Sequence, residues 1–292
     1  MSESTVPPTP DVPLVDVLGQ PALTLRSADG AEATLLLYGA HLVSWKPAGA
    51  GEQLYLSPQA VAGQGQAVRG GVPVIFPQFE QRGPDVSLPR HGLARTRLWR
   101  LEEVRQTRDF AQATLVLTDD DSTRAWWPHA FQLELTVSIS GARLDIELHA
   151  HNPGPSTWPF SAALHTYLAV SELTSVRLQG LDGCHFIDSV LGGEAIEDHP
   201  EKRFHGEIDR IYAQASKLLL RDGPRRLAID SDNLPDAVIW NPGPDKCAVM
   251  KDMPPEGWQS MLCIEAARIL EPVTLGPDES WTGRQTLTLL SS

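Results

Sequence analysis

The chain has 292 residues, of which 41% are hydrophobic and 21% are charged. This is an ordinary globular composition, and the length suits one large domain or two small ones. The formal net charge of −13 argues against nucleic acid or an anionic membrane as the main partner. No apolar run approaches the length that spans a membrane, so membrane insertion is not expected.

The N-terminal residues 1–13 are polar and rich in proline, and we expect them to form a disordered extension. They lack the basic start and the apolar stretch of a secretory signal peptide. The three cysteines, Cys184, Cys247 and Cys263, are too few and too scattered for a disulfide framework or a zinc site. These features together predict a cytoplasmic protein.

Short apolar segments recur from Leu14 onward, and Gly, Pro, Asp or Asn interrupts them about every ten residues. The clearest alternation of apolar and polar side chains covers residues 131–140 and 144–151, which is typical of antiparallel strands with one buried face. Gly141-Ala142 between them predicts a hairpin turn. Further strands are expected at 22–26, 33–38, 38–45, 53–56, 99–104 and 112–118.

Helical periodicity is weak throughout, and the best short candidates are residues 57–63 and 122–126. Many short strands with turn residues between them predict an all-β sandwich or barrel. We find no internal repeat of fixed period and no linker that would divide the chain. Residues 14–292 are therefore expected to form a single domain.

An Arg-rich segment runs from Ala67 to Arg100 and carries six arginines against two acidic residues. Arg69 and Arg95 stand beside glycine or small residues, which allow the backbone to approach a ligand closely. Arginine is the side chain best suited to hold a phosphate through paired donors. A basic segment in an acidic protein predicts a site for a small anion, and ordinary surface charge is the alternative interpretation.

Three motifs of this segment resemble the hexose-6-phosphate mutarotases (glucose-6-phosphate 1-epimerases) of the galactose-mutarotase-like superfamily. They are Arg-Gly-Gly-Val-Pro (69–73), Phe-Pro-Gln-Phe (76–79) and Leu-Pro-Arg-His-Gly-Leu-Ala-Arg (88–95). The resemblance covers residues 35–289. It implies a large twisted antiparallel β-sandwich with few short helices, the galactose-mutarotase-like supersandwich. It also implies cofactor-independent interconversion of the α and β anomers of hexose 6-phosphates.

Two further segments carry the expected acid and base. His165 follows the small, apolar Phe-Ser-Ala-Ala-Leu (160–164), where an imidazole stays close to neutral and can give or take a proton. Glu265 follows Met-Leu-Cys-Ile (261–264), where a carboxylate needs a partner or a solvated cleft. By residue type alone, His165 also suits a strand histidine of the core or rim, and Glu265 a strand end facing water. The resemblance implies that His165 is the general acid and Glu265 the general base.

The resemblance also implies a set of substrate-binding residues. Asp209, in Gly-Glu-Ile-Asp-Arg-Ile-Tyr (206–212), matches an aspartate that contacts sugar hydroxyls, and carboxylates accept hydrogen bonds from hydroxyls. An exposed loop charge is the alternative for this residue. Arg69 and Arg95 would hold the phosphate, with Arg90 and His91 also at the site. Relatives often carry glutamine at position 90, where arginine either strengthens phosphate binding or faces solvent.

One departure from the family pattern lies in the same segment. The family usually has glycine after Phe-Pro-Gln-Phe, whereas this chain has Glu80. An acidic side chain close to a phosphate would oppose its binding. The shape of the loop 80–88 and the identity of the substrate are therefore left open by the sequence.

His149 and His151 lie two residues apart on one strand face, a spacing that metal sites can use. Asp145 and Glu147 share that face, as on a solvated strand surface, and no third ligand motif is apparent. We therefore predict no metal and no cofactor.

The expected partner is a small-molecule sugar phosphate, and the protein is expected to be a monomer. Two other functions stay open. One is an aldose 1-epimerase acting on unphosphorylated sugars. The other is a non-catalytic sugar-phosphate-binding or regulatory protein on the same scaffold, because a fold does not fix a function. Retention of both His165 and Glu265 argues against the second, since a binding protein needs neither.

Overall fold

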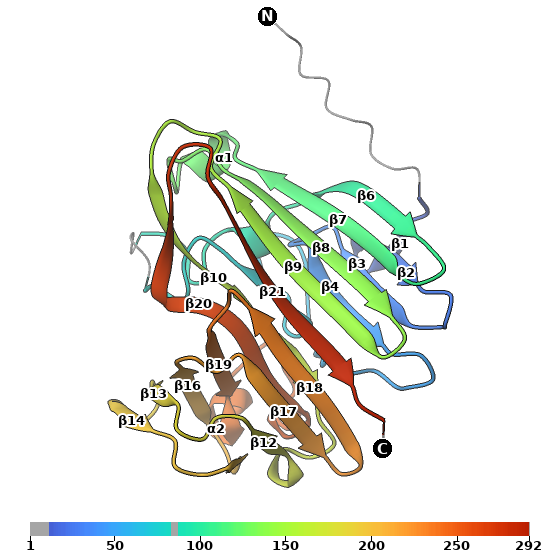
Figure 1. Ribbon diagram of the computed structural model, residues 1–292, viewed down its shortest axis with the longest axis vertical. Coiled ribbons are helices and arrows are strands. Elements are labelled where there is room, and N and C mark those ends of the chain that lie inside the picture. Colours follow the sequence, from blue (N-terminus) through green and yellow to red (C-terminus); the bar gives the residue numbers. More distant parts are fainter. Residues whose placement is uncertain (1–11, 83–86, 292) are drawn as a thin grey trace, which may run out of the picture.

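The computed structural model describes residues 12–82 and 87–291, which form three antiparallel β-sheets with a few short helices (Figure 1). The all-β prediction is confirmed. The predicted N-terminal extension lies outside the described residues up to residue 11, and Val12 packs against the main core. No helix in the described ranges is long and apolar enough to cross a membrane.

The smallest sheet has the order β1-β2-β3-β4. Its strands are β1 (Val15–Val17), β2 (Gln20–Arg26), β3 (Glu32–Leu36) and β4 (His41–Lys46). The eight-stranded sheet has the order β14-β13-β16-β19-β20-β10-β5, with β11 also paired to β20. Its strands are β5 (Val74–Ile75), β10 (Trp158–Leu164), β11 (Tyr167–Ala169), β13 (His185–Asp188), β14 (Glu194–Ile196), β16 (Ile208–Tyr212), β19 (Asp236–Asn241) and β20 (Met261–Leu275).

The nine-stranded sheet has the order β15-β12-β17-β18-β21-β9-β8-β7-β6. Its strands are β6 (Arg100–Gln106), β7 (Ala111–Thr118), β8 (Gln132–Ser140), β9 (Arg143–His151), β12 (Arg177–Gln179), β15 (Glu201–Arg203), β17 (Lys217–Asp222), β18 (Arg225–Asp232) and β21 (Ser280–Leu289). The helices are α1 (Asp121–Arg124), α2 (Gly243–Ala248) and the 3₁₀ turns η1 (Ala94–Thr96), η2 (Leu173–Ser175) and η3 (Gly257–Ser260).

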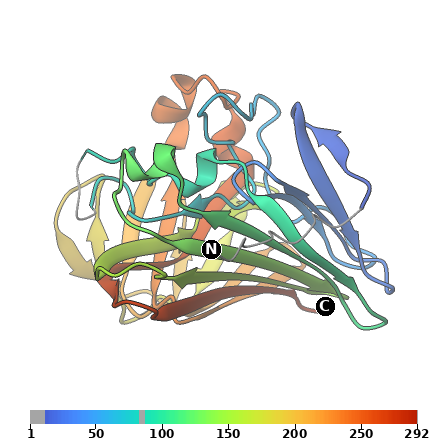
Figure 2. The same cartoon turned by 90° about the horizontal axis from the view of Figure 1, so that it is seen from above.

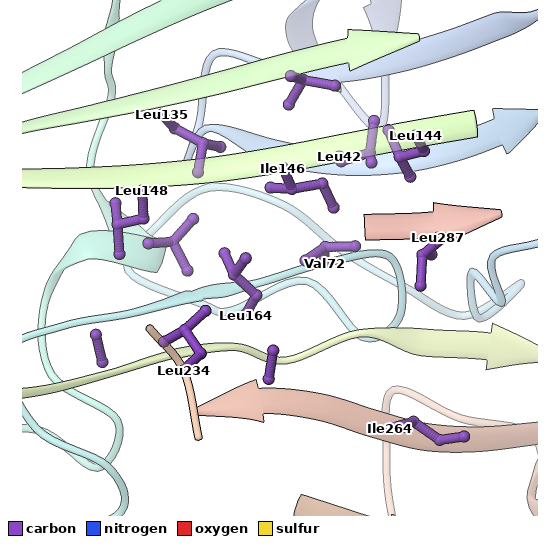
Figure 3. Packing of buried hydrophobic residues seen from close by; sticks show 14 of the residues in the cluster. Leu42, Val72, Leu135, Leu144, Ile146, Leu148, Leu164, Leu234, Ile264 and Leu287 are labelled. Atoms are coloured by element: carbon purple, nitrogen blue, oxygen red, sulfur yellow. The ribbon is translucent and has the colours of Figure 1, made fainter. Parts of the chain in front are cut away.

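The core lies between the nine-stranded sheet and the other two sheets, which Figure 2 shows on one side of it. Along β8 and β9 every second side chain is buried, as the alternation in the sequence predicts. The predicted hairpin turn is confirmed, because Ser140 and Arg143 pair across Gly141-Ala142. Leu135 and Ile146 of the nine-stranded sheet belong to the same buried cluster as Ile264 of β20 (Figure 3).

Two local predictions are wrong. Residues 53–56 make isolated bridges, Leu54 to Leu168 and Leu56 to Gly70, instead of a strand. Residues 57–63 form a turn and irregular backbone instead of a helix. The other helical candidate, 122–126, overlaps α1, which Asp120 begins by accepting a hydrogen bond from the Thr123 backbone N–H.

The strand predicted at 38–45 begins only at His41, because Gly39 and Ala40 turn the chain with φ of 75° and 45°. A Cβ atom at Gly39 would lie 2.6 Å from the carbonyl oxygen of Arg95. Glycine is therefore required for this close approach. The contact ties the β3–β4 turn to the end of the Arg-rich segment.

The predicted strand around His165 is interrupted at that residue. β10 ends at Leu164, which pairs with Ala266, and β11 begins at Tyr167, which pairs with Cys263. In the gap, the His165 backbone N–H donates to the carbonyl oxygen of Pro73 instead of to β20 (3.0 Å). Because β10 and β11 both pair with β20, the gap places His165 beside Glu265 of that strand.

Candidate active site

All the predicted site residues line one pocket of about 260 Å³. They are Arg69, Arg90, His91, Arg95, His165, Asp209 and Glu265. The wall also contains residues that the sequence analysis did not assign to the site: Phe79, Glu80, Tyr167, Val238, Trp240, Lys246 and Met250. The segment between β4 and β6, the β10–β11 gap and strands β16, β19 and β20 thus converge on one cavity.

His165 and Glu265 are in direct contact, with 3.3 Å between Nδ1 and Oε1. Both side chains are buried, 9% and 1% exposed. Burial raises the pKa of Glu265 well above its ordinary value, and the nearby Asp209 raises it further. Burial also lowers the pKa of His165, as do the neighbouring His91 and Arg95. The free site therefore favours a neutral imidazole beside a protonated carboxyl, a pair that holds one transferable proton.

Aromatic rings fix the plane of the His165 imidazole. Tyr167 stacks on it almost parallel, with 4.8 Å between ring centroids and 7° between planes. His91 and Trp240 meet it edge-on, at 5.7 Å and 6.2 Å. These contacts restrict the rotation of the imidazole and keep Nδ1 facing the carboxylate of Glu265.

A buried glutamine stabilises the β10–β11 gap through hydrogen bonds. Gln285 on β21 accepts a hydrogen bond from the Thr166 hydroxyl at 2.5 Å and donates to the Ile264 carbonyl oxygen at 3.1 Å. The Ile264 backbone N–H in turn donates to the Thr166 carbonyl oxygen (3.0 Å). Gln285 therefore connects the residue after His165 with the residue before Glu265. No motif in the sequence pointed to it.

His91 lies on a tight turn, with φ of 65° followed by Gly92 at 71°. A Cβ atom at Gly92 would come within 2.1 Å of the Phe76 carbonyl oxygen, so this turn needs glycine. The Nδ1 atom of His91 accepts a hydrogen bond from the Glu80 backbone N–H (3.2 Å), which leaves Nε2–H as the ring's donor. Burial, Arg95 and Arg90 lower the pKa of His91 to about 2, so this donor is neutral.

Arg69 and Arg95 place two partly buried guanidinium groups at the pocket. Arg69 donates to the Oδ2 atom of Asp252 from Nε (3.2 Å), while its Nη2 lies 3.1 Å from that atom. Its Nη1 donates to the Tyr167 hydroxyl (2.9 Å). Arg95 donates from Nη2 to the carbonyl oxygen of Arg90 (2.9 Å) and makes no ion pair with any described residue. Burial and the neighbouring arginines lower its pKa to about 10, as expected where positive charges are crowded.

Arg90 lies at the rim of the pocket, with 61% of its side chain exposed and Nη2 2.6 Å from Oε1 of Glu80. Glu80 also pairs with Arg82 at 3.3 Å. The unusual acid of this loop therefore has two cationic partners, and residues 83–86 beyond them lie outside the described ranges. Asp209 is half-buried on β16 rather than in an exposed loop, and burial followed by Glu80 raises its pKa.

Comparison with known proteins agrees with this geometry. Residues 21–288 match the family model described as aldose 1-epimerase. A protein of Cenchrus ciliaris named "Putative glucose-6-phosphate 1-epimerase" is 32% identical over 98% of this chain and 90% of its own length. A protein of Escherichia coli (strain K12) with the same name is 36% identical over 81% of this chain and 79% of its own.

A solved structure from Salmonella typhimurium, described as that of "a putative mutarotase", superposes with a TM-score of 0.88 at 29% identity. It covers 96% of this chain and 93% of its own. The expected galactose-mutarotase-like sandwich is thereby confirmed. The chain belongs to the aldose 1-epimerase family, and it is an isomerase with a small-molecule sugar substrate.

Proposed function

We propose that the protein interconverts the α and β anomers of hexose 6-phosphates without a cofactor. One observation carries this proposal: the His165–Glu265 pair shares its pocket with the partly buried guanidinium groups of Arg69 and Arg95. An acid and a base in contact suit a reaction at one carbon, and two neighbouring arginines suit a phosphate. The names of the relatives from Cenchrus ciliaris and Escherichia coli support the same substrate class.

In the proposed mechanism Glu265 takes the proton from the hydroxyl on C1 while His165 protonates the ring oxygen. The electron pair of the O1–H bond forms the carbonyl, and the pair of the C1–ring-oxygen bond moves to the ring oxygen. Rotation about C1–C2 and closure with the roles reversed give the other anomer. Both oxygens are bonded to C1, so the acid and the base must lie close together, and 3.3 Å between Nδ1 and Oε1 meets this need.

The phosphate would also prepare the pair for this reaction. Arg69 and Arg95 lower the pKa of His165 through their charge. A bound dianion compensates that charge and so raises the pKa of the His165 imidazole, which favours the protonated form that can donate to the ring oxygen. Proton transfer by each positioned group typically contributes roughly 10²–10⁴-fold.

The remaining pocket residues divide between phosphate and sugar. Arg69 and Arg95 hold the phosphate in this proposal, and Arg90 adds positive charge at the rim. Asp209 accepts from sugar hydroxyls, and the Nε2–H of His91 is a neutral donor to a sugar oxygen. A monomeric, cytoplasmic protein stays our expectation.

An aldose 1-epimerase acting on free sugars would use the same acid and base. Arg95 forms no ion pair with a described carboxylate, and this charge favours the phosphorylated substrate over the alternative. A non-catalytic sugar-phosphate-binding protein would have no need of a buried imidazole in contact with a buried carboxyl.

The test is the rate of anomer exchange, followed by NMR, on glucose 6-phosphate and on glucose. The wild type should prefer the phosphate, and Arg95→Ala should lower kcat/KM for glucose 6-phosphate by roughly tenfold to a hundredfold more than for glucose. Arg97→Ala is the matched control, because Arg97 contacts Ser122 and does not line the pocket.

If Arg95→Ala lowers kcat/KM equally on glucose 6-phosphate and glucose, the free-sugar epimerase is favoured. Phosphate binding without exchange of either sugar would favour the non-catalytic protein.

A further inference from the structure

Tyr167 contacts both halves of the proposed site. Its buried ring stacks on the His165 imidazole, with 4.8 Å between centroids. Its hydroxyl accepts a hydrogen bond from Nη1 of Arg69 at 2.9 Å. Its backbone N–H donates to the carbonyl oxygen of Gly71 (2.9 Å), in the segment that carries Arg69. One side chain thus joins the expected phosphate ligand to the expected general acid.

The chemistry of the substrate requires these two parts to be neighbours. In a hexose 6-phosphate the ring oxygen and the phosphate are separated only by C5, C6 and O6. A group that protonates the ring oxygen must therefore lie a few bond lengths from the groups that bind the phosphate. The Arg69–Tyr167–His165 contacts provide this proximity.

Asp252 limits where the phosphate can approach Arg69. Its carboxylate is the partner of Nε and Nη2 (3.2 and 3.1 Å) and would repel a dianion from that edge of the guanidinium. Asp252 also lines a second hollow, which shares only Arg69, Arg95 and Tyr167 with the active-site pocket. The phosphate is therefore expected on the pocket side, at the edge where Nη1 meets the Tyr167 hydroxyl.

The Tyr167 hydroxyl still has a hydrogen to donate. It accepts from Arg69, which has no acceptor atom to offer in return, and no residue in the described ranges accepts its own hydrogen. Burial raises the pKa of Tyr167, so the hydroxyl stays a phenol at neutral pH. A phosphate oxygen beside Arg69 would complete its hydrogen bonding.

We propose that the Tyr167 hydroxyl donates to the 6-phosphate while its ring holds the His165 imidazole in the plane from which it protonates the ring oxygen. This inference rests on the proposed function and adds a specificity residue to it. Because the same side chain touches both groups, the phosphate contributes to kcat as well as to KM.

The test compares two substitutions of Tyr167. Tyr167→Phe keeps the stacked ring and removes the hydroxyl. It should lower kcat/KM for glucose 6-phosphate at least about tenfold more than for glucose, with part of the loss in kcat. It should also weaken the binding of inorganic phosphate about tenfold, as measured by isothermal titration calorimetry. Tyr167→Leu removes the ring as well, and should lower kcat on both sugars and shift the acidic limb of the pH profile.

Tyr212→Phe is the matched control. The Tyr212 hydroxyl donates to Glu197 (2.8 Å), and Tyr212 does not line the pocket. This variant should lower Tm without changing the preference for the phosphorylated sugar or the affinity for inorganic phosphate.

The outcomes separate this inference from the proposed function. Suppose that the wild type prefers glucose 6-phosphate, but that Tyr167→Phe lowers kcat/KM equally on both sugars and binds inorganic phosphate as tightly as the wild type. Tyr167 is then not a phosphate ligand, and the proposed function stands. A loss confined to KM would overturn the coupling to His165. A wild type that neither binds inorganic phosphate nor prefers the phosphorylated sugar would overturn both proposals.

Discussion

The contact between His165 and Glu265 allows two buried, ionisable groups to coexist without a net charge. Each group alone would leave an unpaired charge or an unsatisfied polar atom in a low-dielectric site. Together they can hold one proton in two arrangements, neutral or ionised. In the proposed mechanism, this pair stores the proton that ring opening moves.

Glu265→Gln and His165→Ala should each lower kcat by about 10²–10⁴-fold on glucose 6-phosphate, because each removes one proton-transfer group. Each variant should also lose one limb of the bell-shaped pH profile. Glu134→Gln, on the nine-stranded sheet away from the pocket, serves as the control. NMR exchange rates across pH check this, and wild-type rates in either catalytic variant would exclude the mechanism.

His41 provides a prediction about stability. It is fully buried, its Nε2 lies 2.7 Å from the Gly70 carbonyl oxygen, and burial lowers its pKa from 6.5 to about 4. Unfolded chains therefore bind a proton at His41 between these values while the folded chain does not, so stability falls as pH drops through this window. The loss amounts to about 3 kcal/mol.

His41→Gln should make the unfolding free energy depend less steeply on pH in this acidic range. The measurement is urea unfolding between pH 7 and pH 4, and the remaining limb should include His91, whose pKa is also lowered by burial. An unchanged pH dependence in the variant would mean that His41 is protonated in the folded state.

The pocket residues that could be predicted from the sequence are polar or ionisable side chains within a recognisable motif, such as Arg69, His91 and Glu265. Tyr167 lines the same pocket, but in the sequence an aromatic residue within an apolar strand is indistinguishable from core. Gln285 could not be found at all, because its partner Thr166 lies 119 positions away. Contacts of this kind depend on which strands the fold brings together.

At the level of the strands, the sequence predicted those that have one face in water. It failed where tertiary packing determines whether a segment forms a strand. Residues 131–151 show alternation because one face of β8 and β9 meets water. Residues 53–56 have strand-forming side chains, yet they form only isolated bridges. The sequence did not reveal the gap between β10 and β11 either, since its residues lie in an apolar, strand-like segment. The gap depends on a tertiary hydrogen bond, in which the His165 backbone N–H donates to the Pro73 carbonyl oxygen instead of to β20.

Gln285→Met should disturb this gap while keeping a side chain of similar volume. It removes the partner of the Thr166 hydroxyl and of the Ile264 carbonyl oxygen, which costs about 1–3 kcal/mol in unfolding free energy. We also expect a lower kcat with little change in KM, because His165 loses its support. Gln132→Met, on the half-buried face of β8, should change neither. A fall in stability alone would limit Gln285 to a structural role.

For the whole molecule, we predict that the sheets unfold as one unit. Leu287 on β21 is fully buried in the cluster that also holds Leu42 of the four-stranded sheet and Ile264 of the eight-stranded sheet (Figure 3). Leu287→Ala should lower the unfolding free energy by about 2–5 kcal/mol. Loss of activity, tryptophan fluorescence and far-UV circular dichroism should shift together in urea.

Leu98→Ala is the control, because Leu98 is 64% exposed and should change stability by less than about 0.5 kcal/mol. Separate transitions for activity and circular dichroism would show that residues 14–292 contain more than one cooperative unit.

The position of β21 in the nine-stranded sheet has a consequence during synthesis. It follows every other described strand in the chain, yet it lies in the interior of the sheet, paired with β18 and β9. A nascent chain would hold β9 and β18 as two open edges until Ser280–Leu289 leaves the ribosome. Unpaired strand edges can form hydrogen bonds with other chains, so during this interval the nascent chain is prone to aggregate or to bind a chaperone. Because Gln285 arrives on the same strand, the hydrogen bonds that join Thr166 to Ile264 could form only after β21 has been made.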